Sequence, residues 1–166
     1  MNELKELMLA KPSLTLAVAE SLTSGRLQAK VGSISGASTF FLGGITAYSL
    51  GEKVRHLGID PVEAEAVNSV SSRVAEQMAS GACRLFGSDL GVATTGYAEP
   101  YPDRKVEVPF AWWGLARRLP SGEFALSSGR VECPGLARVE VQEKVASAAL
   151  AALCALLRGR SAGRTP

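Results

Sequence analysis

The sequence predicts one α/β domain in which helices cover both faces of a mixed sheet, a three-layer α/β/α arrangement. Short apolar runs suited to buried strands alternate with helical segments through the first half of the 166-residue chain. Two extended segments joined by a Pro-Ser-Gly turn then predict a hairpin, which a long Ala/Leu-rich helix follows. We expect a single domain over residues 1–157, a flexible tail over 158–166 and no fused partner domain.

The first elements follow from apolar patterning and from helix-breaking residues. Residues 2–11 form an amphipathic pattern that Pro12 stops, which predicts a short helix. The nearly continuous apolar run LTLAVAE at 14–20 predicts a buried strand. The polar cluster after it supplies helix-capping residues, so we expect a helix over about 23–32 and a loop over 31–39.

The middle of the chain predicts one strand and three helical segments. Residues 40–48 suit a strand. A helix over 52–58 should end at Gly58, and a further turn over 60–67 should begin at the capping residue Asp60. A longer helix should span 71–86, where one apolar stripe consists of Val74, Met78, Ala82 and Leu85.

The last part of the chain predicts the other half of the sheet. A short buried strand over 90–94 enters a turn-rich loop. Two strands over 108–117 and 122–132 should pair as the hairpin, and a helix should cover 138–157. Trp112 and Trp113 would then point to opposite faces, one into the core and one to the surface or an interface.

Composition excludes several functional classes. Apolar residues make up 46% and charged residues 20%, and 18 Lys+Arg against 16 Asp+Glu give a net charge of +2. These values argue against a disordered chain and against a dedicated nucleic-acid binder. The sequence has no run long enough to span a membrane and no signal peptide, and its three cysteines are far apart. We therefore expect a cytoplasmic protein with reduced thiols and no metal site.

One serine stands where a nucleophile would be favoured. AVAESLTSG at 17–25 places Ser21 at a strand-to-helix turn, where unpaired backbone N–H groups around Thr23–Gly25 could stabilise an oxyanion. The alternative is that Ser21 or Thr23 only caps the helix. The sequence contains a single histidine, His56, for which we expect a surface role, so a lysine is the other candidate base. Lys53 follows a predicted buried strand that ends in Tyr48, although most lysines are simply solvated.

Four spaced segments resemble one known family. AVAESLTSG, LGGITAYSLGEK at 42–53, VSSRVAEQMASGA at 70–82 and LGVATTG at 90–96 occur in this order. Together they resemble the CinA C-terminal domain family, the nicotinamide mononucleotide deamidases. The similarity is close over about residues 14–98 and looser up to 157.

The resemblance implies a serine amidohydrolase that needs neither metal nor cofactor. Such an enzyme hydrolyses the carboxamide of nicotinamide mononucleotide to nicotinate mononucleotide and ammonia. The resemblance assigns the nucleophile to Ser21, the lysine to Lys53 and an assisting tyrosine to Tyr48. It also implies a homo-oligomer, with a dimer favoured, and no nucleic-acid or membrane partner. The residues expected to line the substrate site are Glu20, Thr23, Ser24, Gly25, Thr95, Gly96 and Arg138. Glu20 could orient Lys53 or Thr23, or could cap the helix.

The substrate-holding segments depart from the family pattern. A Gly-rich loop has become Tyr/Pro-rich over residues 96–110, and it carries Glu99 and Asp103, which would repel a phosphate. Ser24 replaces a glycine, and only Arg138 remains of a late Gly-Asp-Arg signature. Three explanations stay open: the family reaction with altered loops, hydrolysis of a different small amide, or loss of catalysis with survival as a binding module.

Overall fold

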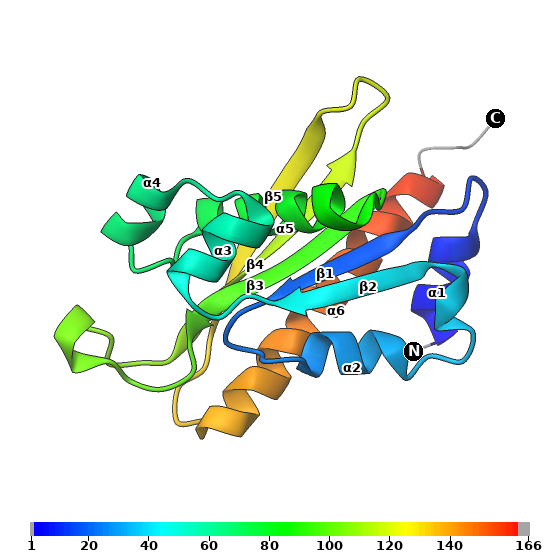
Figure 1. Cartoon of the computed structure of the whole chain (residues 1–166). Helices are drawn as coiled ribbons and strands as arrows, with labels where there is room; N and C mark the ends of the chain where they lie inside the picture. Colours follow the sequence, from blue (N-terminus) through cyan, green and yellow to red (C-terminus); the bar gives the residue numbers. More distant parts are fainter. Residues whose placement is uncertain (1, 163–166) are drawn as a thin grey trace.

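The computed structural model describes residues 2–162 and contains a five-stranded mixed sheet (Figure 1). Its strands are β1 (Leu16–Glu20), β2 (Phe41–Thr46), β3 (Leu90–Tyr97), β4 (Phe110–Arg118) and β5 (Phe124–Glu132). They lie in the order β2-β1-β3-β4-β5, in which β2, β1 and β3 run parallel. β4 pairs antiparallel with β3 and with β5, so the predicted hairpin and the mixed sheet are confirmed.

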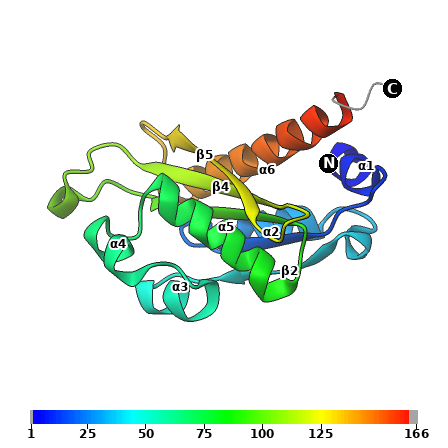
Figure 2. The same ribbon diagram turned by 90° about the horizontal axis from the view of Figure 1, so that it is seen from above.

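Helices cover both faces of the sheet, which confirms the three-layer fold class (Figure 2). One apolar cluster joins the sheet to α1 (Asn2–Leu9), α2 (Arg26–Gly32) and α6 (Arg138–Ala162). A second cluster on the opposite face joins it to α3 (Leu50–Leu57), α4 (Pro61–Ala66) and α5 (Ser72–Phe86).

Glycines bring α5 very close to the sheet and α3 very close to α5. A Cβ atom at Gly91 would lie 2.0 Å from the Ala79 carbonyl oxygen, and one at Gly114 would lie 2.3 Å from that of Ala75. A Cβ atom at Gly81 would likewise lie 2.3 Å from the Leu57 carbonyl oxygen of α3. Only glycine permits such approaches, so these positions fix where α3 sits above the sheet.

Local signals predicted the end of α3 and the start of α4. Gly58 closes α3 in the left-handed conformation at φ 62°, and the Asp60 carboxylate accepts hydrogen bonds from the first amides of α4. Both caps depend only on neighbouring residues, which explains why the sequence alone predicts them.

Four predictions about the elements need correction. Helix α2 begins at Arg26 rather than about 23, and Gly25, not a serine or threonine side chain, stands at its N-cap. β3 extends to Tyr97 rather than 94, because β4 pairs with it along its whole length. Helix α6 continues to Ala162, so 158–162 are helical rather than part of a flexible tail, and 163–166 lie outside the described residues. Leu85 is 47% exposed: the buried stripe of α5 continues through Cys83 to the partly buried Phe86 instead.

The two tryptophans lie on opposite faces, as predicted, but neither is fully buried. Trp113 packs against the core cluster under α6 and lies over Gly129 of β5. Trp112 is half-buried on the face that carries α5, because side chains alternate along β4.

Candidate active site

A pocket of about 450 Å³ opens at the carboxyl ends of β1 and β3. Ser21 reaches it because side chains alternate along β1: Ala17 and Ala19 enter the core under α5, and Ser21 is the next residue on that side. Its amide donates to the Thr94 carbonyl oxygen at 3.0 Å, which ties the turn to β3. The serine is 7% exposed.

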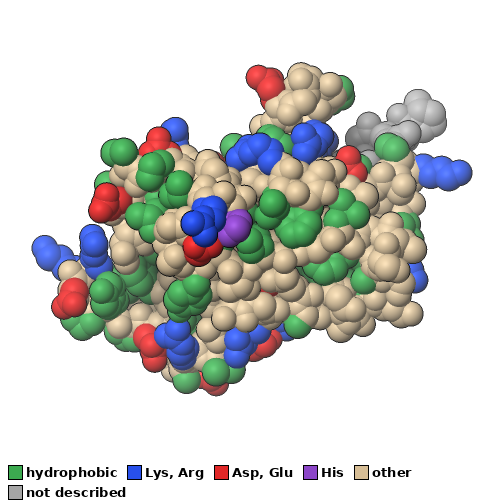
Figure 3. Space-filling view, viewed as in Figure 1, with side chains coloured by type: hydrophobic (Ala, Val, Ile, Leu, Met, Phe, Trp, Pro, Cys, Tyr) green, Lys and Arg blue, Asp and Glu red, His purple; other side chains and the backbone are tan. Residues whose placement is uncertain are grey.

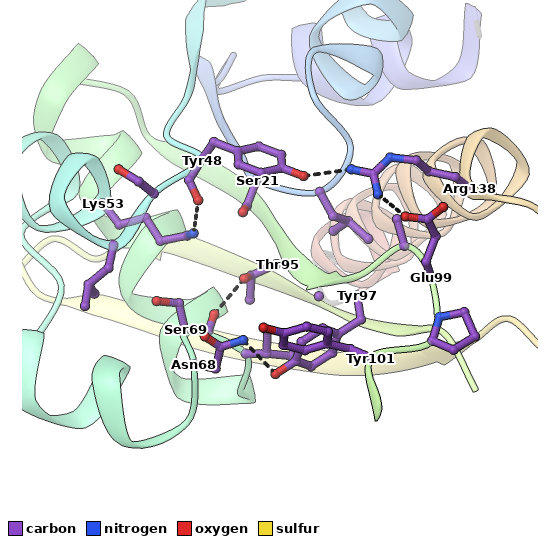
Figure 4. A pocket seen from close by; sticks show the side chains of 17 residues that line it. Ser21, Tyr48, Lys53, Asn68, Ser69, Thr95, Tyr97, Glu99, Tyr101 and Arg138 are labelled. Atoms are coloured by element: carbon purple, nitrogen blue, oxygen red, sulfur yellow. Dashed lines mark hydrogen bonds and ion pairs between the residues drawn. The ribbon is translucent and has the colours of Figure 1, made fainter. Parts of the chain in front are cut away.

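Lys53 lines the same pocket from α3 and points inward (Figure 4). Its side chain is only 3% exposed, and its Nζ donates to the Tyr48 carbonyl oxygen at 2.8 Å. Burial disfavours the charged form and lowers the pKa of Lys53 from 10.5 to about 8. An amine with that pKa is partly neutral near physiological pH, which is the condition for a lysine to act as a base.

Tyr48 lines the pocket but does not touch Lys53 through its phenol. We expected its hydroxyl to hydrogen-bond within the Ser21–Lys53 pair. Instead the phenol oxygen accepts a hydrogen bond of 2.9 Å from Arg138 Nη2, and the side chain is 53% exposed. The backbone carbonyl of Tyr48 is the group that holds the lysine.

Arg138, at the first turn of α6, joins two other segments at the edge of the pocket. Besides Tyr48, it contacts Glu99 of the β3–β4 loop, with 2.6 Å between Nη1 and Oε2. Both side chains are largely exposed. Figure 4 shows this group on the opposite side of the pocket from Lys53.

The structure resolves the role of Glu20 in favour of helix capping. The Glu20 carboxylate is fully buried beneath the start of α2. Its two oxygens accept hydrogen bonds from the Thr23 hydroxyl and from the amides of Gly25, Leu27 and Gln28. An anion at this position satisfies amides that a helix start leaves unpaired. Glu20 therefore orients Thr23 and α2, and it does not contact Lys53.

Four residues predicted to bind substrate are not among those that line the pocket: Glu20, Thr23, Ser24 and Gly25. The Thr23 hydroxyl lies 2.7 Å from that of Thr94 and is buried. The amide of Ser24 donates to the Ser21 carbonyl oxygen, and that of Gly25 to Glu20. These two amides are therefore unavailable for an oxyanion, contrary to expectation.

Thr95 and Gly96 do line the pocket, as predicted, together with residues that sequence reasoning missed. The Thr95 hydroxyl donates to the Ser69 carbonyl oxygen at 2.7 Å. Asn68 and Ser69, in the α4–α5 loop, both adopt positive φ (50° and 58°), and the Asn68 amide donates to the Tyr97 hydroxyl. The polar run NSVSS between two helices was the available signal, but nothing in it indicates that the loop folds back onto β3.

The cysteines and the histidine, which could also take part in chemistry, lie outside the pocket. Cys83 and Cys133 are buried, as expected for Cys83, and burial raises the pKa of both thiols. His56, the purple side chain in Figure 3, is on the surface, where its ring contacts Glu52.

Within residues 2–162, no cluster of three or more His, Cys, Asp or Glu could hold a metal ion. No helix in the same range is long and apolar enough to cross a membrane.

Comparison with known proteins decides the family. A family model described as the CinA C-terminal domain matches residues 1–157. The chain belongs to this family. The resemblance based on the four spaced segments is therefore confirmed. The family assignment covers the site, since all residues that line the pocket fall within the matched range.

Similar CinA sequences come from several bacteria. A CinA-like protein of Chlorobaculum tepidum is 40% identical over 126 residues, which cover 74% of this chain and 29% of the relative. A putative competence-damage inducible protein of Moorella thermoacetica is 46% identical over 93 residues, covering 56% of this chain and 22% of that protein. The chain thus spans less than a third of these relatives' length.

Solved CinA structures share the whole fold. A competence or damage-inducible protein from Enterobacter asburiae superposes with a TM-score of 0.84 at 27% identity, covering 94% of each chain. The competence damage-inducible protein A of Klebsiella pneumoniae gives a TM-score of 0.81 at 27% identity, covering 95% of this chain and 94% of that one.

Proposed function

We propose that this chain is a metal-independent serine amidohydrolase of the nicotinamide mononucleotide deamidase type. It would hydrolyse the carboxamide of nicotinamide mononucleotide to nicotinate mononucleotide and ammonia. The observation that carries the proposal is that Ser21 and Lys53 line one pocket, with the lysine buried and its pKa lowered to about 8. A lysine that pointed into water, away from the serine, would instead have favoured a non-catalytic binding module.

The first half of the reaction forms an ester with Ser21. Neutral Lys53 accepts the hydroxyl proton while the Ser21 oxygen attacks the carboxamide carbon. The negative charge that develops on the carbonyl oxygen needs amide donors. The turn already uses the amides of Ser21, Ser24 and Gly25, which leaves that of Leu22, a residue that lines the pocket, as the candidate. Collapse of the tetrahedral intermediate breaks the C–N bond, and Lys53 returns the proton to the departing ammonia.

The second half of the reaction releases the acid. Water attacks the ester carbon, Lys53 again accepts a proton, and the C–O bond to Ser21 breaks. The proton then returns to the Ser21 oxygen, so the enzyme ends as it began. The products are one carboxylic acid and one ammonia for each amide and water consumed.

An aromatic amide suits the wall of the pocket opposite the serine. Tyr97 and Tyr101 both line the pocket, with ring centroids 5.8 Å apart, and Phe110 supports Tyr97 in an edge-to-face contact at 5.5 Å. The hydrogen bond from Asn68 holds the Tyr97 hydroxyl in place. Fixed aromatic rings can stack on a planar pyridine ring.

Ammonia release from nicotinamide mononucleotide tests the proposal. We expect turnover by the wild-type chain and a loss of several powers of ten in Ser21→Ala and in Lys53→Met, because nucleophile and base act as a unit. Ser127→Ala, at an exposed serine of β5, is the matched control and should keep full activity. Undiminished turnover by Ser21→Ala, or no ammonia from a panel of aromatic amides, would overturn the assignment. The homo-dimer stays a prediction, which light scattering of the purified chain tests.

A further inference from the structure

The outer side of the pocket carries a cation that is already paired with an anion. Arg138 and Glu99 both line the pocket and approach to 2.6 Å. The Arg138 guanidinium is held on its other side by the Tyr48 hydroxyl at 2.9 Å. Hydrogen bonding to Glu99 is the largest of the effects that raise the pKa of Arg138, so the arginine remains charged throughout any practical pH range.

Arg138 is the cation that a phosphate on a bound ligand would need. Among the described residues that line the pocket, the basic side chains are Lys53 and Arg138. Lys53 is buried on the serine side, where the proposed reaction requires it to be neutral. A phosphate monoester carries roughly −1.5 to −2 charges at neutral pH, and arginine is well shaped to bind it.

The Glu99 carboxylate opposes that interaction through its charge. The pair is exposed, with 44% of the Arg138 side chain and 59% of the Glu99 side chain accessible, so separating it costs little. Once separated, however, the tethered carboxylate stays near the guanidinium and repels a phosphate bound there. Asp103, the other acidic residue of this loop, does not line the pocket, which leaves Glu99 as the relevant anion.

We infer that Glu99 is a specificity-determining residue that shifts this pocket from phosphorylated amides toward their unphosphorylated counterparts. For the proposed reaction, Glu99 lessens the preference for nicotinamide mononucleotide over the ribosylated pyridine carboxamide without a 5′-phosphate. This inference rests on the proposed function for the identity of the substrate, although its physical content is the charge balance around Arg138.

The test compares nicotinamide mononucleotide with nicotinamide riboside, two compounds that differ by the phosphate. Wild type, Glu99→Gln and the matched control Glu123→Gln are assayed for kcat/KM on both. Glu123 lies in the β4–β5 turn, at the opposite end of the sheet from the pocket, and its change removes the same charge. Binding of both compounds is also titrated in a Ser21→Ala background, which gives a readout that needs no turnover.

We expect Glu99→Gln to raise the preference for the nucleotide over the nucleoside by about tenfold, or about 1.4 kcal/mol. The nucleoside alone should change less than about twofold, because it has no charge near residue 99. Glu123→Gln should leave the preference unchanged. Raised salt should shrink the difference between wild type and Glu99→Gln, as screening of an exposed charge requires.

An unchanged preference in Glu99→Gln, an equal change for both compounds, or the same effect in Glu123→Gln would overturn the inference. So would a failure of both compounds to bind any variant. If both bind, with the expected shift in preference, but wild type releases no ammonia, the proposed hydrolase fails while the role of Glu99 stands.

Discussion

Replacing Lys53 with methionine should change the stability of this protein in a way that depends on pH. Lys53 is 3% exposed, and its pKa is lowered from 10.5 to about 8. The unfolded chain therefore binds a proton more tightly than the folded chain does. Below pH 8 this difference costs stability in full, and the cost disappears as the pH rises from about 8 to about 10.5.

The size of the effect follows from the two pKa values. Each unit of difference corresponds to about 1.4 kcal/mol, so the free energy of unfolding of wild type should gain about 2–3 kcal/mol relative to Lys53→Met between pH 7 and pH 10. Methionine also leaves the Tyr48 carbonyl oxygen without its donor. That loss does not depend on pH, so it does not affect how the stability difference between wild type and Lys53→Met changes with pH.

Urea denaturation of wild type and Lys53→Met at several pH values measures this slope. Lys105→Met, at an exposed lysine, is the control, because it removes a charge without removing a buried amine. If the difference between wild type and Lys53→Met stays constant from pH 7 to pH 10, Lys53 is not a buried base. The mechanism proposed for Ser21 would then lose its proton acceptor.

Four further outcomes follow from the structure. Turnover should rise about tenfold per pH unit below pH 8 and level off above it, since neutral Lys53 is the active form; an ammonia assay with a flat profile would contradict this. Glu20→Ala should lower the free energy of unfolding by about 3–5 kcal/mol in urea, because it removes a buried carboxylate that caps α2; a change below 1 kcal/mol would refute that role. Gly91→Ala should destabilise by about 3 kcal/mol or more, since its Cβ would meet the Ala79 oxygen at 2.0 Å. Gly51→Ala, in open space on α3, should instead stabilise by about 0.5–1 kcal/mol, and thermal melts distinguish the two.

For the two candidate catalytic residues, the sequence predicted the position in the fold. The apolar run before Ser21 predicts a buried strand, and its end places the serine at the carboxyl edge of the sheet, as the structure has it. The position of Lys53 on a helix was also predicted. The inward direction of its side chain was expected only from the family resemblance, because it depends on how closely α3 packs against α5 at Gly81.

Partners far apart in the chain explain the errors at the site. The phenol of Tyr48 was expected beside Lys53, but Arg138, 90 residues later, holds it instead. Glu20 could have oriented a lysine or capped a helix, and the sequence could not choose, because both roles suit a buried carboxylate. Only the path of the chain after β1 shows that the amides of α2 surround it.

The sequence by itself determined the alternation of helices and strands, the helix caps at Gly58 and Asp60, and the serine at the end of β1. These features depend on residues within a few positions of one another. Only the tertiary structure decided that Lys53 is buried and that Glu99 neutralises Arg138. Burial and ion pairing are properties of the space around a side chain, and that space is formed by segments that the local sequence does not contain.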